Sequence, residues 1–282
     1  MEMAQDRSGF LIQKHEEHGD VFVSRALVRD LMFVRDPALV YGINVTHWAD
    51  FYKPDYIKMM WKPFLGEGLV PNDGESWKRQ HKLILPGFHK KRVDAYADTM
   101  VEFTERMLSR WREGERRDMR LELNGLALEV VANTLFDIDI GKEDSKTIRD
   151  AIGEVSEILV TDADKMIPRP DWWPTANNRR KKRAIAEIEK IIARVHQDRL
   201  ENQEDRGDLF SHMVFVEDEQ GPMSDKQLRD EAMTLIFAGH ETTAHALTWT
   251  WYLLAKHPDK VDRMREELDR VLGGRRIEVK DL

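Results

Sequence analysis

The sequence has 282 residues, of which 41% are hydrophobic and 34% are charged, and its formal net charge is −8. This length allows one large domain or two ordinary ones, and the negative charge argues against general nucleic-acid binding. The chain has no cysteine, which excludes disulfides, cysteine-based zinc sites and a thiolate ligand supplied by this chain. No apolar run reaches the length of a membrane span and residues 1–10 do not form a signal peptide, so we expect a cytoplasmic protein without stable membrane insertion.

The first third of the chain predicts short helices and a small β region. The expected elements are a helix at 8–18, a hairpin with strands at 21–24 and 31–34, and a short helix that begins at Asp36-Pro37 and ends before Gly42. The stretch from Asp55 should be irregular at first, because prolines and glycines punctuate it. A helix should then begin near Gly74 and stop at Leu85, since Pro86-Gly87 cannot continue it.

The remaining two thirds of the chain predict mostly helices. Hydrophobic periodicity favours helices at 90–112, 121–136, 142–159, 179–200 and 209–216, with a loop rich in proline and tryptophan at 167–174. Ser224 followed by Gln227 is the capping-box pattern, and it begins a helix that need not stop until Pro258, about 30 residues later. A further helix should begin at Pro258 and end at Gly273. We therefore expect a mainly α fold with a small N-terminal β region.

Inside the long helix, the stretch from Leu235 to Thr243 carries a glycine, an acid and two hydroxyls in apolar surroundings. An interior glycine costs about 1 kcal/mol relative to alanine, and a buried glutamate without a partner costs more. His240 and His245 do not form a zinc pair, because a spacing of five residues turns them roughly 140° apart on a helix. Two interpretations stay open, a kink in a long helix and a cofactor site.

The cofactor hypothesis makes a geometric prediction for this stretch. Ala238, Gly239 and Thr242 should share one helical face, at spacings of three and four residues. Small residues there would leave room for a flat group beside the helix, and Thr242 would present a hydroxyl to it. Glu241 could then pass protons inward from water.

Two further clusters contain basic residues. Trp77 and His81 are four residues apart, so an indole N–H and an imidazole could jointly hold an anion; the alternative is a solvated basic helix with one core tryptophan. The run Arg-Arg-Lys-Lys-Arg at 179–183 resembles a nucleic-acid patch, and with Trp172 and Trp173 it could also touch an anionic membrane. Because the whole chain is acidic, we favour an exposed helix start and expect no nucleic-acid partner.

These motifs, in this order, resemble the cytochrome P-450 superfamily of haem-thiolate monooxygenases. The stretch 238–243 is similar to the oxygen-activating motif of the family's I helix. Trp77 and His81 are similar to the C-helix pair that binds a haem propionate, in which arginine is more common than histidine. Three further segments fit the family and extend the resemblance over essentially the whole chain: Gly19-Asp20-Val21, Leu85-Pro86-Gly87-Phe88 and Ala255-Lys256-His257-Pro258.

The resemblance implies the cytochrome P-450 fold, with helix A and the first strands at 1–36, the C helix at 74–85, the I helix at 224–256 and the J helix at 258–272. It implies haem b as the cofactor, held by Trp77, His81, Ala238, Gly239 and Thr242. Thr242 and Glu241 would be catalytic, and Val70 and Ala238 would contact the substrate. The reaction would insert oxygen from O2 into a small lipophilic molecule, with electrons from NAD(P)H through a ferredoxin or flavin reductase.

The family's Glu-x-x-Arg motif and haem-ligating cysteine loop would follow Gly273, so the resemblance implies that residues 1–282 form a single partial domain, truncated before the K helix. Without that cysteine we expect no metal ligand from this chain, weak or no haem binding, and no activity of the chain alone. The helix at 224–256 is apolar nearly all round, so the chain alone should also be poorly soluble. The alternative is a non-catalytic helical interaction fragment without haem.

Overall fold

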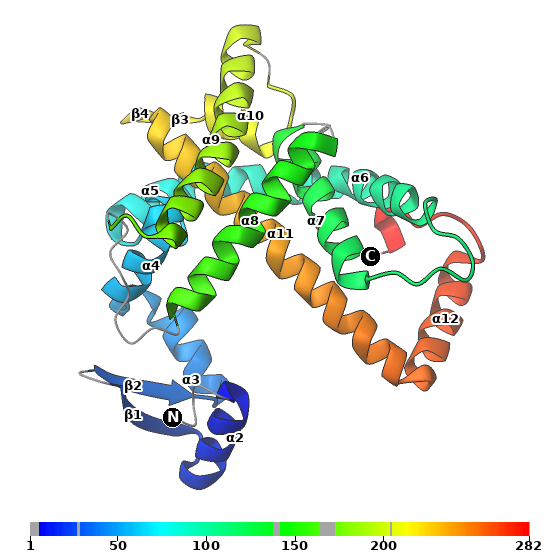
Figure 1. Ribbon diagram of the computed structural model, residues 1–282, viewed down its shortest axis with the longest axis horizontal. Coiled ribbons are helices and arrows are strands. Elements are labelled where there is room, and N and C mark those ends of the chain that lie inside the picture. The colour runs from blue at the N-terminus through cyan, green and yellow to red at the C-terminus, as the bar shows by residue number, and fades with distance from the viewer. Residues whose placement is uncertain (1–5, 27–28, 138–141, 164–172, 204, 282) are drawn as a thin grey trace.

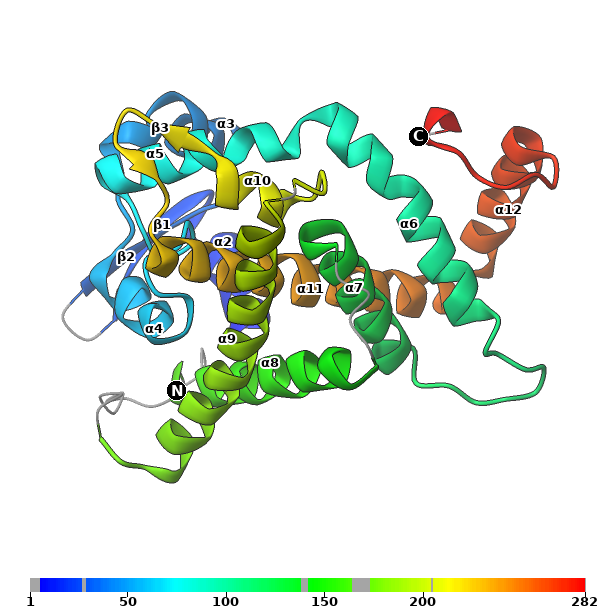
Figure 2. The same cartoon turned by 90° about the horizontal axis from the view of Figure 1, so that it is seen from above.

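The computed structural model describes residues 6–26, 29–137, 142–163, 173–203 and 205–281. It confirms the mainly α fold with a small N-terminal β region (Figure 1). The longest helix, α11 (Asp225–Lys256), runs through the molecule, and α12 (Pro258–Leu272) projects from its end. The hairpin of β1 (Val21–Ala26) and β2 (Arg29–Val34) lies far from α12 in both views (Figure 2).

The other elements surround α11. In chain order, the helices before it are α2 (Arg7–His18), α3 (Pro37–Tyr41), α4 (Asp55–Leu65), α5 (Gly74–Ile84), α6 (Lys90–Leu108), α7 (Met119–Phe136), α8 (Lys142–Ala163), α9 (Ala176–Asn202) and α10 (Leu209–Phe215). Short helical turns lie at Gly42–Thr46, Trp48–Asp50, Leu85–Phe88 and Val279–Asp281. Strands β1 and β2 pair antiparallel, with Val21 opposite Val34, and β3 (Glu217–Asp218) pairs with β4 (Gly221–Pro222) just before α11.

Local capping explains where the helices begin. The Ser224 hydroxyl accepts from the Gln227 N–H, and the Gln227 side chain accepts from the Ser224 N–H, which confirms the capping box at the start of α11. Helix α9 begins at Ala176, earlier than predicted, because the Thr175 hydroxyl accepts from the Asn178 N–H and caps it. Residues 167–172 of the expected proline- and tryptophan-rich loop lie outside the described residues.

Helix α4 is a correction, because irregular structure was expected there. Pro63 lies in its last turn, and a proline in a helix interior costs about 3 kcal/mol. Phe64 and Leu65 follow directly and are fully buried, and burying such side chains contributes about 1.5–3 kcal/mol each. Packing of this turn into the core therefore offsets the cost of the proline. The periodic apolar residues, and not the prolines and glycines, determine the structure of this segment.

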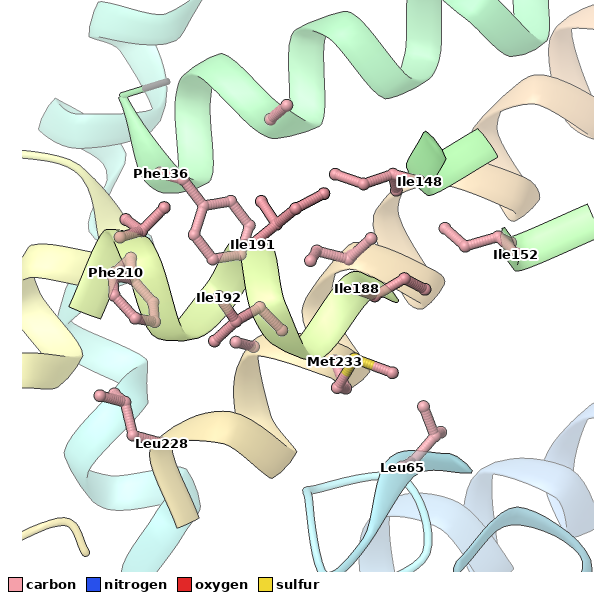
Figure 3. Close-up of a cluster of buried hydrophobic side chains, with 14 of the residues drawn as sticks. Leu65, Phe136, Ile148, Ile152, Ile188, Ile191, Ile192, Phe210, Leu228 and Met233 are labelled. Carbon is pink, nitrogen blue, oxygen red and sulfur yellow. The ribbon is translucent and has the colours of Figure 1, made fainter. Parts of the chain in front are cut away.

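The core lies where α9 crosses α7, α8 and α11. The apolar stripe predicted for α9 is buried along its length, from Ile185 to Val195. Figure 3 shows Ile188, Ile191 and Ile192 of this helix among side chains from its neighbours. These neighbours are Phe136 of α7, Ile148 and Ile152 of α8, Phe210 of α10 and Met233 of α11. The N-terminal half of α11 is thus buried from two sides.

The C-terminal half of α11 is different, because it carries large side chains that are open to solvent. Trp249 is 62% exposed and Trp251 is 48% exposed, and Tyr252 and Leu253 beside them are exposed as well. This half therefore shows the extended apolar face that was expected of the helix. In the described part of the chain, no helix combines the length and the apolarity that crossing a bilayer requires.

A buried ion pair joins the ends of three helices. Arg199 of α9 is 1% exposed, and it donates to Asp208 Oδ2 at 3.2 Å and to the Phe136 carbonyl at 2.6 Å. It also donates to Ser211 Oγ at 2.9 Å, and Asp208 itself caps α10. Removing one partner of such a pair leaves an uncompensated buried charge, which is far more costly than losing a surface pair.

Replacing Arg199 with methionine should therefore strongly destabilise the protein. We expect Arg199→Met to lower the free energy of unfolding by about 3–5 kcal/mol, measured by urea denaturation. Arg183→Met, at an exposed position on the same helix, is the matched control and should change it by about 0.5 kcal/mol or less. Equal stability of the two variants would show that the Arg199 cluster does not hold these helix ends together.

Candidate active site

Helix α11 presents Ala238 and Thr242 to solvent, one helical turn apart. The Thr242 hydroxyl donates to the Ala238 carbonyl at 2.6 Å. This local bond fixes the threonine rotamer and occupies its proton, while the lone pairs of Oγ1 stay available as acceptors. The two residues therefore form an exposed face with small side chains and one oriented hydroxyl.

Gly239 contributes to this region in a different way from the one expected. A Cβ atom on Gly239 would lie 3.0 Å from Val131 Cγ2 of α7, so the space that the glycine leaves open serves helix packing. Its missing side chain does not clear room on the solvent face that Ala238 and Thr242 share. The assignment of Gly239 to a cofactor therefore rests on its backbone alone and stays a prediction.

His240 belongs to the helix interface. It is 2% exposed, and its Nε2 lies 3.0 Å from Asn124 Oδ1 of α7, which makes Nε2 the protonated donor. Burial lowers the pKa of His240 to about 4, so the ring is neutral near pH 7. His245 is exposed on another side of the helix. Among the residues that the structure describes, no group of three or more His, Asp or Glu side chains is arranged to hold a metal ion.

Glu241 is half-buried at the contact of α11 with α8. Its carboxylate accepts a hydrogen bond from Ser156 Oγ at 2.9 Å. A glutamate at this interior position therefore has a partner from a second helix. Glu241 and Thr242 follow each other along the helix, so their side chains diverge by about 100°. The acid thus borders the exposed face and connects it to α8.

On α5, the predicted pair Trp77 and His81 shares one face. The two rings stack with centroids 5.0 Å apart and an interplanar angle of 24°. Trp77 is half-buried and also packs against Trp48, 5.9 Å away, whereas His81 is exposed. In the described part of the chain, the Trp77 indole N–H has no acceptor among the hydrogen bonds observed. The geometry is thus compatible with a shared anion, which stays a prediction.

The loop between α4 and α5 carries Val70, which is 38% exposed, and it is tied to α11 by two buried carboxylates. Asp230 accepts from the Glu67 N–H at 2.9 Å, and Glu231 accepts from the Leu69 N–H at 3.0 Å. A Cβ atom on Gly68 would lie 2.2 Å from Thr234 Oγ1, so only glycine lets the loop approach α11 this closely. The loop that carries Val70 is therefore held in a fixed position against α11.

Sequence reasoning missed Asp230 and Glu231. The pattern that could have found them is a pair of adjacent acids directly before the apolar residues Ala232 and Met233, where α11 enters the core. Glu231 is 0% exposed and its Oε1 has no hydrogen-bond partner. Burial raises the pKa of Glu231 to about 7, and the neighbouring Asp230 acts in the same direction. Its protonation therefore changes near neutral pH.

The basic run at 179–183 forms part of α9 without gathering as a free cationic patch. Arg180 pairs with Glu154 at 2.7 Å and with Glu157 at 3.7 Å, both on α8. Lys181 is buried, and Arg179 donates to the Pro174 carbonyl. The helix-start interpretation is thus supported for these residues, because much of their charge and hydrogen-bonding capacity is used within the protein.

Helices packed around one long helix, which exposes small side chains and an oriented hydroxyl, define a mainly helical class of protein. The family comparison agrees, since residues 2–282 match the family described as Cytochrome P450. The chain belongs to the cytochrome P450 family. This family carries a haem iron bound by a cysteine thiolate, whereas the present chain contains no cysteine.

Several curated relatives are similar over most of this chain. Cyclooctatin synthase of Streptomyces melanosporofaciens is 34% identical over 92% of the chain and 57% of the relative. Cytochrome P450 97B1, chloroplastic, of Pisum sativum is 30% identical over 91% of the chain and 52% of the relative. Cyclooctat-9-en-7-ol 5-monooxygenase of S. melanosporofaciens is 30% identical over 78% of the chain and 49% of the relative. The chain thus spans about half the length of the curated relatives it matches.

Replacing Glu231 with glutamine should change how stability depends on pH. A carboxyl pKa that is raised from 4.5 to about 7 contributes stability below pH 4.5, and this contribution is lost as pH rises through 7. Glutamine does not titrate, so Glu231→Gln should gain up to about 3 kcal/mol relative to wild type between pH 5 and pH 8. Urea denaturation at both pH values measures the difference.

The matched control for this experiment is Glu266→Gln, at an exposed position on α12. It should shift stability equally at the two pH values. If Glu231→Gln also shifted stability equally, Glu231 would not be protonated in the folded protein near neutral pH.

Proposed function

We propose that the complete protein is a haem-dependent monooxygenase that inserts one oxygen atom from O2 into a small lipophilic molecule. The observation that carries this proposal is the Thr242 hydroxyl, fixed by the Ala238 carbonyl on an exposed helical face. Glu241, the preceding residue, is an acid whose carboxylate accepts a hydrogen bond from Ser156. Family membership and the relative named as a monooxygenase support the same chemistry.

The residues present fit haem b, a flat apolar group with two carboxylates. Ala238 and Thr242 would lie against its plane, and Gly239 would contribute backbone. Trp77 and His81 would hold a carboxylate, since the indole N–H faces no protein acceptor in the described residues. When bound and ligated by a cysteine from outside these residues, haem supplies the iron centre at which O2 is activated.

The chain's own residues would then control protons. The Thr242 hydroxyl donates its proton to the Ala238 carbonyl and so offers an oriented acceptor at the exposed face. Glu241 is half-buried between α11 and α8, where Ser156 holds its carboxylate in one orientation. A carboxylate placed between solvent and the face that a bound cofactor would cover can take up a proton on one side and release it on the other. We therefore assign the delivery of protons to Glu241. We assign to the oriented hydroxyl of Thr242 the positioning of the proton at the exposed face.

Substrate, partners and location form the finer part of the proposal. Val70, on the loop that Asp230 and Glu231 fix, and Ala238 would contact the substrate. Electrons would come from NAD(P)H through a ferredoxin or flavin reductase. We keep a cytoplasmic location in the proposal, although relatives such as cytochrome P450 97B1 are described as chloroplastic. Cell fractionation with an antibody to the chain would test the location.

A second candidate is a non-catalytic helical interaction fragment. The observation in its favour is the exposed apolar half of α11, with Trp249 and Trp251 at its surface. The coding DNA separates the two candidates at low cost. An open frame that continues past Leu282 to a Glu-x-x-Arg motif and a cysteine-bearing loop would favour the enzyme, and a stop codon would favour the fragment.

The first test of the enzyme proposal is spectroscopic. A thiolate-type ferrous–carbonyl absorption band needs a cysteine ligand, and this chain has none, so the chain with hemin, dithionite and CO should not show it. An in-frame fusion to the C-terminal half of a cytochrome P450 relative should show the band. A folded fusion that takes up no haem would contradict the proposed function, and a thiolate band from the chain alone would contradict our account of the ligand.

The second test addresses Thr242 in that fusion. Thr242→Ala removes the oriented hydroxyl, so we expect more hydrogen peroxide per NAD(P)H consumed, by about tenfold, with the fold unchanged. Thr250→Ala is the matched control, because Thr250 makes the same kind of bond to the Ala246 carbonyl, at 2.8 Å, farther along α11. Equal coupling of NAD(P)H consumption to product in wild type and Thr242→Ala would refute the role.

A further inference from the structure

The loop at 66–72, between α4 and α5, is attached to α11 through its backbone. The N–H of Leu69 donates to Glu231 Oε2 at 3.0 Å. Glycines with positive φ lie at both ends of the loop, Gly66 at 58° and Gly74 at 66°. Glycine can change its backbone conformation at low cost, so these two positions can act as hinges. A change at Glu231 therefore acts directly on the backbone of a hinged loop.

The carboxylate of Glu231 is poorly compensated as an anion. It is 0% exposed and its Oε1 has no hydrogen-bond partner. Among the residues that the structure describes, no cation lies within 4 Å of it, because Lys226 and Arg229 pair with Asp230 instead. Lys53, just before α4, favours the ionised form from a greater distance, whereas Asp230 opposes it. An ionised carboxylate in such a place must either take up a proton or gain water.

The other charged groups at this contact compensate each other. Glu67 of the loop pairs with Lys62 of α4 at 2.8 Å, and Lys226 of α11 lies 3.7 Å from the same carboxylate. Asp230 also accepts from the Glu67 N–H at 2.9 Å. Glu231 is thus the acid at this contact that combines complete burial with an unpartnered oxygen in the described part of the chain.

We propose that Glu231 is a proton-operated latch, which holds the 66–72 loop against α11 while its carboxyl is protonated and releases the loop when the carboxyl ionises. A neutral carboxyl needs no counter-charge, and its Oε2 can still accept from the Leu69 N–H. An ionised carboxylate gains the hydration that it lacks when the loop moves away and admits water. Because the loop carries Val70, the latch controls the exposure of this side of the molecule.

Proton linkage gives the direction and the size of the effect. Burial raises the pKa of Glu231 from 4.5 to about 7 in the docked loop, and the hydrated carboxyl of the open loop returns to the ordinary value. The proton therefore stabilises the docked loop fully below pH 4.5, and this stabilisation is lost as pH rises through 7. Between pH 5 and pH 8 the opening constant of the loop should rise by about fiftyfold to one-hundredfold.

The experiment measures backbone amide exchange of the 282-residue chain by mass spectrometry at pH 5 and pH 8. Rates are corrected for the intrinsic exchange rate at each pH, so that protection reports the opening constant. Peptides that cover 66–72 should lose protection by about fiftyfold to one-hundredfold at pH 8. Glu231→Gln keeps an acceptor for the Leu69 N–H and cannot ionise, so the loop should be equally protected at both pH values. Glu266→Gln, exposed on α12, is the matched control and should behave as wild type.

Peptides from α9 distinguish opening of the loop from unfolding of the whole chain. A loss of protection that is larger in the loop than in α9, and absent in Glu231→Gln, supports the latch. Equal protection of the loop at both pH values, the same loss in Glu231→Gln, or the same opening constant for loop and α9 would each overturn it. The latch belongs to the fold of this chain and needs no bound cofactor, so its failure would leave the proposed function standing.

Discussion

Burial of the N-terminal half of α11 against α7 and α9 determines which candidate site residues of this helix face solvent. Ile236 and Met233 face the core, so the adjacent residues of the helix must face either a neighbouring helix or solvent. Gly239 allows α7 to come close, and the same rotation of the helix leaves Ala238 and Thr242 exposed. A helix that was less firmly buried could rotate, and its hydroxyl would no longer have a fixed direction.

The polar side chains on this buried helix are each stabilised in a different way. Asp230 is paired with Lys226 and Arg229 and also binds a loop N–H. Glu231 has a single backbone partner and therefore a raised pKa, and His240 is neutral beside Asn124. Helix propensity predicts none of these interactions, because it treats every polar residue at these positions as unfavourable. They explain how one helix can hold so many charged or titratable groups and still be buried.

The sequence predicted the elements that depend on local physics. The capping box of α11 and the apolar stripe of α9 are local patterns, and both are confirmed. Helix α4 was missed, because its proline outweighs its apolar residues until the core that buries them is known. The contact of Glu231 was missed for a related reason: its carboxylate accepts from the N–H of Leu69, which lies 162 residues earlier in the chain. No pattern along the chain pairs such distant groups.

These long-range contacts also connect the two parts of the candidate site. Trp77 lies on α5 and Thr242 on α11, and the loop that leads into α5 is fixed to α11 by Asp230 and Glu231. A second tie runs from Arg79 of α5 to Asp218 in the hairpin that precedes α11, through two hydrogen bonds of 2.9 Å. An anion held at Trp77 and a flat group lying along Thr242 would thus be positioned by one rigid frame. Of the polar residues of α11, Asp230 and Glu231 therefore help to build this frame, whereas Thr242 faces the open side.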